Sequence, residues 1–161
     1  MEIKEYKTML KSNGHIILRE SRSSENDDEV YNNPEKLATL FHKFYNCDIL
    51  PEEHLFMVAL DAKMHPLGIF EVFLGTINSC LSSPREIYTR ALLCNASAIV
   101  IAHNHPSGDT YPSKLDIKSY KGIAAAGEII GIKMIDGLIL GKNNSYFSFA
   151  EKEILSEITN E

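Results

Sequence analysis

The stretch AIVIAHNHPSGDTYPSKLD, residues 98–116, decides how this chain folds. Its first five residues form a short, fully apolar run, which is typical of a strand at the centre of a sheet. Pro106 stops that strand, and Ser113 is a natural N-cap for a helix that continues to about Gly127. The stretch therefore predicts a strand, a turn and a helix in succession.

The N-terminal part of the chain carries three further signals. An Asn-Gly pair at positions 13 and 14 predicts a hairpin within residues 1–20. Residues 21–33, SRSSENDDEVYNN, are polar and acidic, which favours an exposed linker. Asn33 followed by Pro34 predicts the start of an amphipathic helix. We expect residues 1–32 to form a hairpin with a polar linker, and residues 33–161 to form the compact domain.

The remaining apolar runs alternate with helical patterns. LFMVALDA and LGIFEVFLG flank a turn and predict two adjacent antiparallel strands. Ser83 before Pro84 has the pattern of a capping box and opens a helix that ends near Asn95. The short runs IKMI, GLILG and SYFSF are the last predicted strands. This order places the chain in the α/β class, with a mixed β-sheet flanked by helices.

Composition narrows the function classes. The 161 residues carry a formal net charge of −6, so binding to nucleic acid or to an anionic membrane would need a local basic patch. The N-terminal MEIKEYKTML lacks the apolar core of a signal peptide, and no stretch approaches the roughly 18 apolar residues of a membrane span. Three widely spaced cysteines predict neither a zinc knuckle nor a disulfide framework. We therefore expect a cytoplasmic protein without membrane contact.

Three side chains in the deciding stretch have the types and spacing of a metal site. His103 and His105 share one face at the end of the predicted strand, and Asp116 lies in the first turn of the next helix. Two imidazoles and one carboxylate leave a coordination position open, as in a catalytic zinc site. An HxH pair alone is a weak signal, and Ser113 with Asp116 also fits a plain capping box. Capping and ligation do not exclude each other, because a carboxylate has two oxygens.

Two more residues are candidates for the chemistry. Glu71 is a single acid in an otherwise apolar strand and is a candidate general acid/base, although an edge-strand glutamate that points to solvent fits the same pattern. The Ser113 hydroxyl is a candidate donor to a developing oxyanion, with a role as helix cap alone as the alternative.

The string HNHPSGDTYPSKLD, together with FEVFLGTINS and SPREIY, closely resembles the RadC family, a bacterial branch of the JAMM (MPN-type) metalloproteins. The resemblance covers roughly residues 55–150 and implies a cytidine-deaminase-like α/β architecture. It also implies that zinc is held by the two histidines and the aspartate, that a glutamate is the general acid/base and that a serine stabilises the oxyanion. These roles correspond here to His103, His105, Asp116, Glu71 and Ser113.

The chain departs from this family at two places. It shows no helix-hairpin-helix module before the domain, and it has Asp136-Gly137 where similar proteins commonly have Asp-His. The resemblance implies a zinc-dependent hydrolase, a metallopeptidase or isopeptidase with a peptide or protein substrate. Two alternatives are a DNA-repair-associated accessory protein, and a noncatalytic interaction module stabilised by zinc. We expect weak or no direct DNA binding, because Lys114, Lys118 and Lys121 form the only local basic cluster.

Overall fold

A computed structural model of the chain describes residues 2–25, 30–75 and 83–155. Within these ranges one mixed sheet has the strand order β2-β1-β4-β3-β5-β6-β7. Its strands are β1 (Glu2–Leu10), β2 (Ile16–Glu25), β3 (His54–Leu60), β4 (Pro66–Leu74), β5 (Ala98–Asn104), β6 (Lys133–Leu140) and β7 (Tyr146–Ser148). The helices are α1 (Pro34–Tyr45), the short 3-10 helix η1 (Cys47–Ile49), α2 (Pro84–Leu93) and α3 (Lys114–Ile130).

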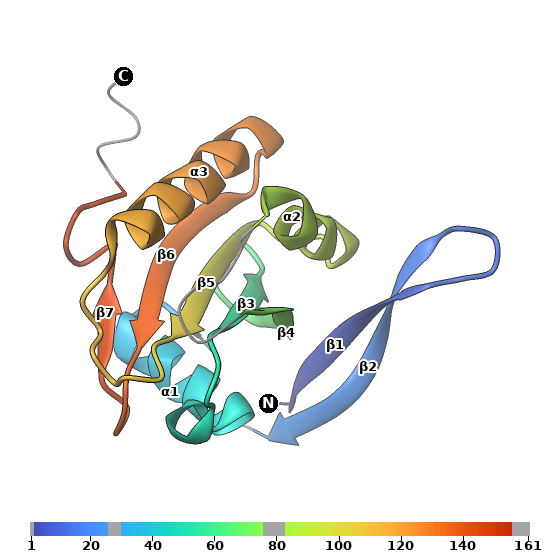
Figure 1. Cartoon of the computed structure of the whole chain (residues 1–161). Coiled ribbons are helices and arrows are strands. Elements are labelled where there is room, and N and C mark those ends of the chain that lie inside the picture. Colours follow the sequence, from blue (N-terminus) through green and yellow to red (C-terminus); the bar gives the residue numbers. More distant parts are fainter. Residues whose placement is uncertain (1, 26–29, 76–82, 156–161) are drawn as a thin grey trace.

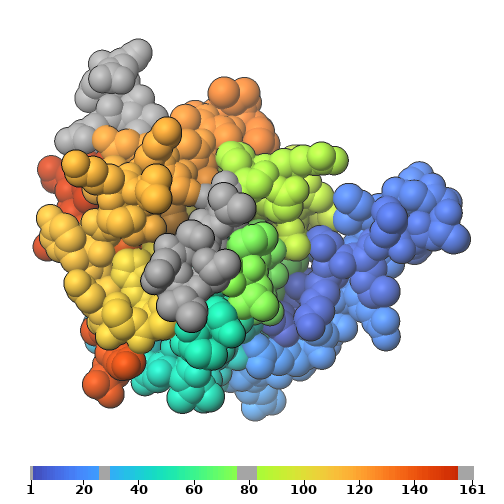
Figure 2. Space-filling model, viewed as in Figure 1, coloured from blue at the N-terminus to red at the C-terminus, as the bar shows by residue number. Residues whose placement is uncertain are grey.

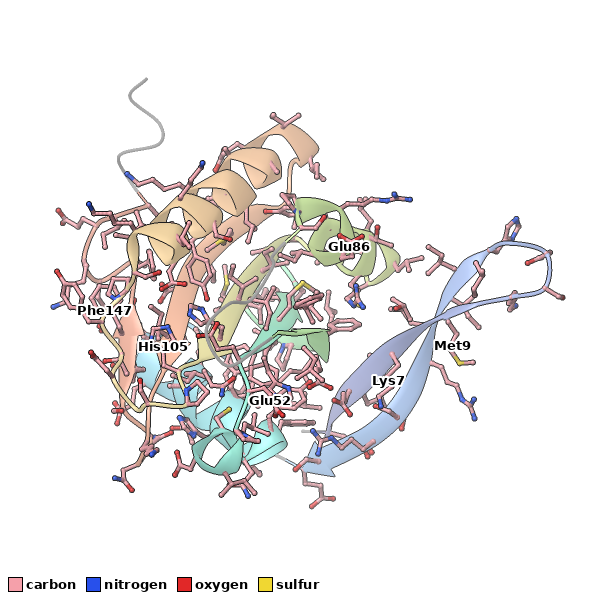
Figure 3. The ribbon with its side chains drawn as sticks, in the orientation of Figure 1. Lys7, Met9, Glu52, Glu86, His105 and Phe147 are labelled. Atoms are coloured by element: carbon pink, nitrogen blue, oxygen red, sulfur yellow. The ribbon has the colours of Figure 1, made fainter. Side chains whose placement is uncertain are left out.

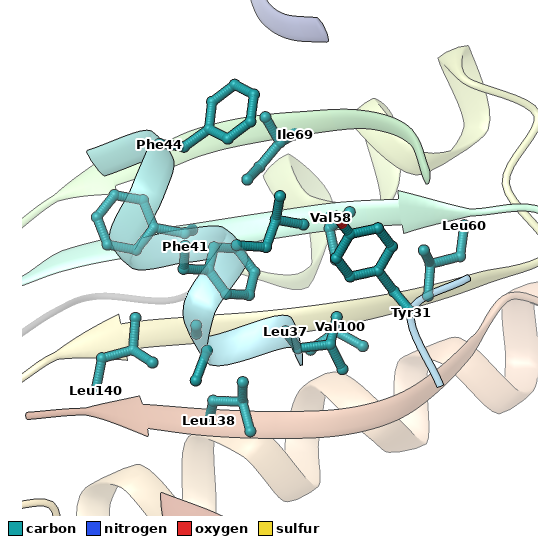
Figure 4. Close-up of a cluster of buried hydrophobic side chains, with 14 of the residues drawn as sticks. Tyr31, Leu37, Phe41, Phe44, Val58, Leu60, Ile69, Val100, Leu138 and Leu140 are labelled. Carbon is teal, nitrogen blue, oxygen red and sulfur yellow. The ribbon is translucent and has the colours of Figure 1, made fainter. Parts of the chain in front are cut away.

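Helices cover both faces of the sheet. Helix α1 packs on one face, and helices α2 and α3 pack on the other, as Figure 1 shows. We call these the α1 face and the α3 face. Figure 4 shows the core of the α1 face, where Phe41 and Leu37 of α1 meet Val58 of β3 and Val100 of β5. Each face therefore has its own apolar core, which confirms the predicted α/β class.

The central strands explain how the faces are assigned. Every residue of β3 and β5 is buried, as the apolar run at 98–102 predicts for a central strand. Successive side chains of a strand point to opposite faces. Leu55 packs in the core of the α3 face and Phe56 in the core of the α1 face. Because β3 and β5 are antiparallel with Leu55 opposite His103, the end of β5 lies beside the start of β3.

The predicted helix starts are largely confirmed. Asn33 caps α1, and its side-chain oxygen accepts a hydrogen bond of 2.8 Å from the Lys36 amide. Ser113 caps α3, which ends at Gly131 in the left-handed conformation that glycine adopts readily. Ser83 precedes α2 but makes no side-chain capping bond to the helix backbone, so the capping box predicted there is wrong.

The N-terminal hairpin is part of the sheet. Its two strands form around the predicted Asn-Gly turn, and β1 pairs in parallel with β4 through Glu5 and Ile69. The expected linker at 21–33 is wrong for its first part, because β2 continues to Glu25; residues 26–29 lie outside the described ranges. The charged side chains of β2 reflect its edge position, where few groups need burial. The far end of the hairpin projects from the rest of the molecule (Figures 1 and 2).

The C-terminal strands differ from expectation in one respect. The runs IKMI and GLILG belong to one continuous strand, β6, rather than to two. Asp136, between them, is buried and accepts hydrogen bonds from the amides of Gly137 and Ala150 and from the hydroxyl of Ser148. A polar residue inside a buried strand is thus satisfied locally, so the strand does not need to break there. None of the described helices has the length and apolar character needed to cross a bilayer.

Candidate metal centre

Three potential ligands converge where β5 ends and α3 begins. His103 is the penultimate residue of β5, His105 follows the strand, and Asp116 lies in the first turn of α3. The Nε2 atoms of the two histidines are 2.9 Å apart. Nε2 of His103 is 3.4 Å from Oδ1 of Asp116, and Nε2 of His105 is 3.7 Å from Oδ2. The ligand atoms of all three residues lie within 4.8 Å of one another, as their spacing in the sequence predicts.

The surrounding backbone orients His105. Its Nδ1 lies 2.6 Å from the carbonyl oxygen of Asp109. A carbonyl only accepts hydrogen bonds, so Nδ1 of the neutral imidazole carries the proton and Nε2 has a free lone pair. In Figure 3, His105 lies near the ends of the central strands, beside the loop that leads into α3. The loop that sequence analysis assigned to the turn therefore also fixes which nitrogen of His105 is available to a metal.

Asp116 is held in its ionised form. Burial by itself would raise the pKa of this carboxyl, but the imidazoles of His103 and His105 beside it hold the pKa well below its ordinary value. Oδ2 also accepts a hydrogen bond of 2.7 Å from the Ser113 amide, and Ser113 Oγ accepts one of 3.1 Å from the Asp116 amide. The capping box and the proposed ligand set therefore share one carboxylate, as the two-oxygen argument predicts.

The three residues fit a metal ion. In a tetrahedral zinc site with bonds of about 2.0–2.1 Å, neighbouring ligand atoms are about 3.3 Å apart. The separations of 2.9, 3.4 and 3.7 Å lie on either side of that value. Two imidazole lone pairs that face each other repel unless a positive charge lies between them. His103, His105 and Asp116 thus form a group that can hold a metal ion.

Glu53 is the acid that the structure brings to this group. It immediately precedes β3, and continuing the register of Leu55 with His103 places position 53 across from position 105. Burial raises the pKa of Glu53, which the nearby His103 and His105 lower and the negative charge of Asp116 raises further. A half-buried carboxyl with a raised pKa beside a metal-binding group is suited to taking up and releasing a proton.

Asn104 fixes the backbone on both sides of Glu53. Its side-chain oxygen accepts a hydrogen bond of 2.8 Å from the His54 amide, and its side-chain amide donates one of 2.9 Å to the carbonyl of Glu52. Asn104 is buried, and its position between the two histidines directs its side chain to the opposite face of β5. The residue between the two ligands therefore attaches the Glu53 segment to the end of β5.

The sequence of this chain matches a known protein family. A family model described as a RadC-like JAB domain matches residues 31–154. The chain belongs to the RadC-like JAB family. Its mixed sheet and three helices agree with the JAB/MPN fold. The resemblance identified from the motif at 103–116 is thereby confirmed.

Similar proteins occur in several bacteria. A UPF0758 protein of Clostridium tetani is 43% identical over 106 residues, covering 66% of this chain and 46% of that protein. A UPF0758 protein of Desulfitobacterium hafniense is 40% identical over 126 residues, covering 78% of this chain and 54% of its own length. The RadC-like chain spans about half the length of the curated relatives it matches.

Glu71, the acid named by sequence analysis, has a different partner in this RadC-like chain. It lies on β4 opposite Phe56, and its Oε1 is 2.5 Å from Nδ1 of His54. The His54 ring stacks on Phe56, whose side chain belongs to the core of the α1 face. Because His103 follows Ile101, which packs in the core of the α3 face, Glu71 and the His103 ring lie on opposite faces of the sheet. Its role as general acid/base stays a prediction.

Ser113 is at the site, where its side chain caps α3. Its Oγ accepts a hydrogen bond from the Asp116 amide, and the hydroxyl hydrogen takes no part in that bond. The residue as a whole is exposed. Both interpretations of Ser113, cap alone and oxyanion donor, are compatible with this geometry.

Sequence analysis missed Glu53 and Tyr120. Glu53 lies outside any apolar run, and only the register between β3 and β5 brings it opposite His105. Tyr120 follows Asp116 by four residues on α3, so helical spacing places it on the same face as that ligand. This i, i+4 relation was the one signal in the sequence that pointed to Tyr120, whose hydroxyl lies 2.7 Å from Nδ1 of His103.

Proposed function

We propose that this chain is a zinc-dependent hydrolase that cleaves peptide or isopeptide bonds in a peptide or protein substrate. The observation that carries the proposal is the convergence of His103, His105 and Asp116 with the half-buried acid Glu53 beside them. Three protein ligands leave room for a water or a substrate oxygen, as catalytic rather than structural zinc sites do. Zinc bound there would act as a Lewis acid and lower the pKa of water.

In this proposal three residues of the chain transfer the proton, stabilise the oxyanion and provide a charged ligand. Glu53 takes the proton of the attacking water and gives it to the nitrogen of the leaving amine, and its raised pKa favours this exchange. Ser113 donates its hydroxyl hydrogen to the oxygen of the substrate carbonyl as negative charge develops there. Asp116 stays ionised throughout, because its pKa is well below the ordinary value. Glu71 is the competing candidate for proton transfer.

Charge argues against nucleic acid as the direct ligand. The formal net charge is −6, and the short stripe of Lys114, Lys118 and Lys121 provides at most a few phosphate contacts. We therefore expect duplex DNA to bind no more tightly than the nonspecific range of about 10⁻⁴ to 10⁻⁶ M near physiological salt.

The test compares the zinc-loaded protein with the His103→Ala variant. Both are incubated with quenched peptide libraries and with lysine-linked isopeptide substrates, and zinc content is measured in each sample. We expect hydrolysis by the loaded protein and none by the variant. Hydrolysis that is equal in the two samples, or no hydrolysis by the fully loaded protein on either substrate class, would overturn the proposal. A nanomolar dissociation constant for duplex DNA at about 150 mM salt would instead favour a DNA-associated role.

A further inference from the structure

Tyr120 makes two hydrogen bonds behind the metal-binding group. Its side chain is 2% exposed, and its hydroxyl oxygen is 2.7 Å from Nδ1 of His103 and 3.0 Å from the carbonyl oxygen of Leu138. The contact with His103 is on the ring nitrogen that does not face the other ligands, because Nε2 of His103 faces His105 and Asp116. Tyr120 therefore lies where a partner that orients a ligand would lie.

The two partners of the Tyr120 hydroxyl determine which group is the donor in each hydrogen bond. A phenol has one hydrogen to donate, and the Leu138 carbonyl can only accept, so the Tyr120 hydroxyl donates to Leu138. The tyrosine oxygen then accepts the hydrogen of His103 Nδ1. With the proton of the neutral imidazole on Nδ1, Nε2 has a free lone pair directed at His105 and Asp116. The chain from His103 through Tyr120 to Leu138 thus selects the ligating tautomer.

Packing holds the Tyr120 ring in place. A Cβ atom at Gly137 would collide with Cδ2 and Cε2 of the ring, so the ring occupies the space that a side chain at 137 would need. On another side the ring packs against Phe149, with centroids 4.7 Å apart. It meets the His103 ring edge-on, with an interplanar angle of 86°. The ring is therefore packed against Phe149 and His103, in space that is open because position 137 is a glycine.

We propose that Tyr120 is a positioning residue for the ligand His103, and that Gly137 provides the space that this role requires. The proposal rests on the proposed metal site and deepens it. It also gives the departure at Asp136-Gly137 a physical meaning, because the absent side chain is what admits the Tyr120 ring. Partners of this kind typically change metal affinity by about 10-fold to 100-fold when they are removed.

Tyr88 offers a matched control. It lies on α2, is 1% exposed, and its hydroxyl donates a hydrogen bond of 2.9 Å to the carbonyl of Ile123. A Cβ at Gly127 would collide with the Tyr88 hydroxyl, as one at Gly137 would collide with the Tyr120 ring. Changing either tyrosine to phenylalanine therefore removes a buried hydroxyl that donates to a backbone carbonyl. The difference is that Tyr120 also accepts a hydrogen bond from His103.

The experiment measures zinc affinity by competition with a chelator for the full chain and its Tyr120→Phe, Tyr88→Phe and Gly137→Ala variants. Thermal unfolding of each metal-free protein measures the structural cost. We expect Tyr120→Phe to weaken zinc binding by about 10-fold to 100-fold, and Tyr88→Phe to leave the affinity within about twofold. Both phenylalanine variants should lower the unfolding midpoint, Tyr120→Phe by more, because it also leaves Nδ1 of buried His103 without its acceptor. Gly137→Ala should weaken zinc binding too, because its Cβ displaces the ring.

Cobalt provides a second measurement. The absorption bands of bound Co²⁺ report coordination geometry, so Tyr120→Phe should change the spectrum and Tyr88→Phe should preserve it. Zinc affinity of Tyr120→Phe within twofold of wild type, or equal losses in the two phenylalanine variants, would overturn the role of Tyr120 alone. A wild-type protein that binds no zinc would overturn the metal site and, with it, this role.

Discussion

Two histidine–carboxylate pairs lie on opposite faces of the same sheet. On the α1 face, Nδ1 of His54 is 2.5 Å from Glu71, and on the α3 face Nε2 of His103 is 3.4 Å from Asp116. The first pair is a single side-chain hydrogen bond between neighbouring strands. The second includes the Nε2 of His105, 2.9 Å from the Nε2 of His103. A carboxylate beside one imidazole makes a hydrogen-bonded pair, whereas a metal site needs several lone pairs that meet at one point.

The difference arises from where the carboxylate comes from. Glu71 is on a strand next to that of His54, so pairing brings two side chains together on one face and no more. Asp116 comes from the N-terminus of α3, where the helix dipole favours a negative charge, and α3 begins opposite the strand end that carries both imidazoles. The junction of strand, loop and helix therefore provides the convergence that a sheet face alone lacks.

The largest expected effect is on kcat, and it should distinguish Glu53 from Glu71. Glu53→Gln should keep zinc and lower kcat by about 10²-fold to 10⁴-fold, because the amide cannot take up the proton of water. Glu71→Gln, the matched change on the α1 face, should leave kcat close to wild type. Steady-state kinetics on a substrate found with the library, with zinc content measured in parallel, decides the assignment. A loss confined to Glu71→Gln would restore the role that the sequence suggested for Glu71.

Removing an imidazole should change zinc affinity on the α3 face and leave it unchanged on the α1 face. His103→Ala and His105→Ala should each weaken zinc binding by more than about 100-fold, since loss of a partner behind a ligand already costs up to that much. His54→Ala should leave zinc binding unchanged. The measurement is zinc retained after dialysis against a moderate chelator. Retention of wild-type zinc by the His103 and His105 variants would show that the metal lies elsewhere.

Asp136 is a buried carboxylate that does not belong to the metal-binding group. It accepts three hydrogen bonds, from Ser148 and from the amides of Gly137 and Ala150. Asp136→Ala leaves these donors without an acceptor, so the free energy of unfolding should fall by about 2–4 kcal/mol. Urea denaturation of the metal-free protein tests this. A loss below about 0.5 kcal/mol would mean that water replaces the carboxylate without cost.

The smallest expected effect is on stability and concerns the N-cap residues of two helices, one on each face of the sheet. Asn33→Ala at α1 and Ser113→Ala at α3 should each lower the free energy of unfolding by about 1 kcal/mol, because each removes an acceptor for an amide of the first turn. If Ser113 is also the oxyanion donor, only its variant lowers kcat. Equal stability losses with unchanged kcat in both variants would leave Ser113 as a cap alone.

Much of the metal group is predictable from sequence because it is local. His103 and His105 are two residues apart on a strand, and Asp116 follows a cap, so strand alternation and helix-capping rules are enough to bring them together. The strands and helices of the domain are predictable for the same reason, since their apolar periodicity is written within each segment.

Glu53 and Glu71 depend on information that no single segment contains. Helices cover both faces of the sheet, so the run LGIFEVFLG is apolar on both sides and does not reveal which face Glu71 occupies. The approach of Glu53 to His105 depends on the register between β3 and β5, which tertiary packing sets. The sequence at 21–25 does not reveal its strand, because a charged edge strand has the polar composition of a linker.

The attachment of the Glu53 segment through Asn104 has a consequence for dynamics. The segment is held to β5 by two side-chain hydrogen bonds, whereas the histidines belong to the central strand and its extension. We therefore expect that loss of the Asn104 side chain would release the Glu53 segment while β5 stays paired with its neighbouring strands. In Asn104→Ala, the His54 amide should exchange its hydrogen for deuterium much faster while the amides within β5 stay protected. Such a protein would hold its metal in a site whose acid is intermittently absent, and turnover would be gated by a local opening of the backbone.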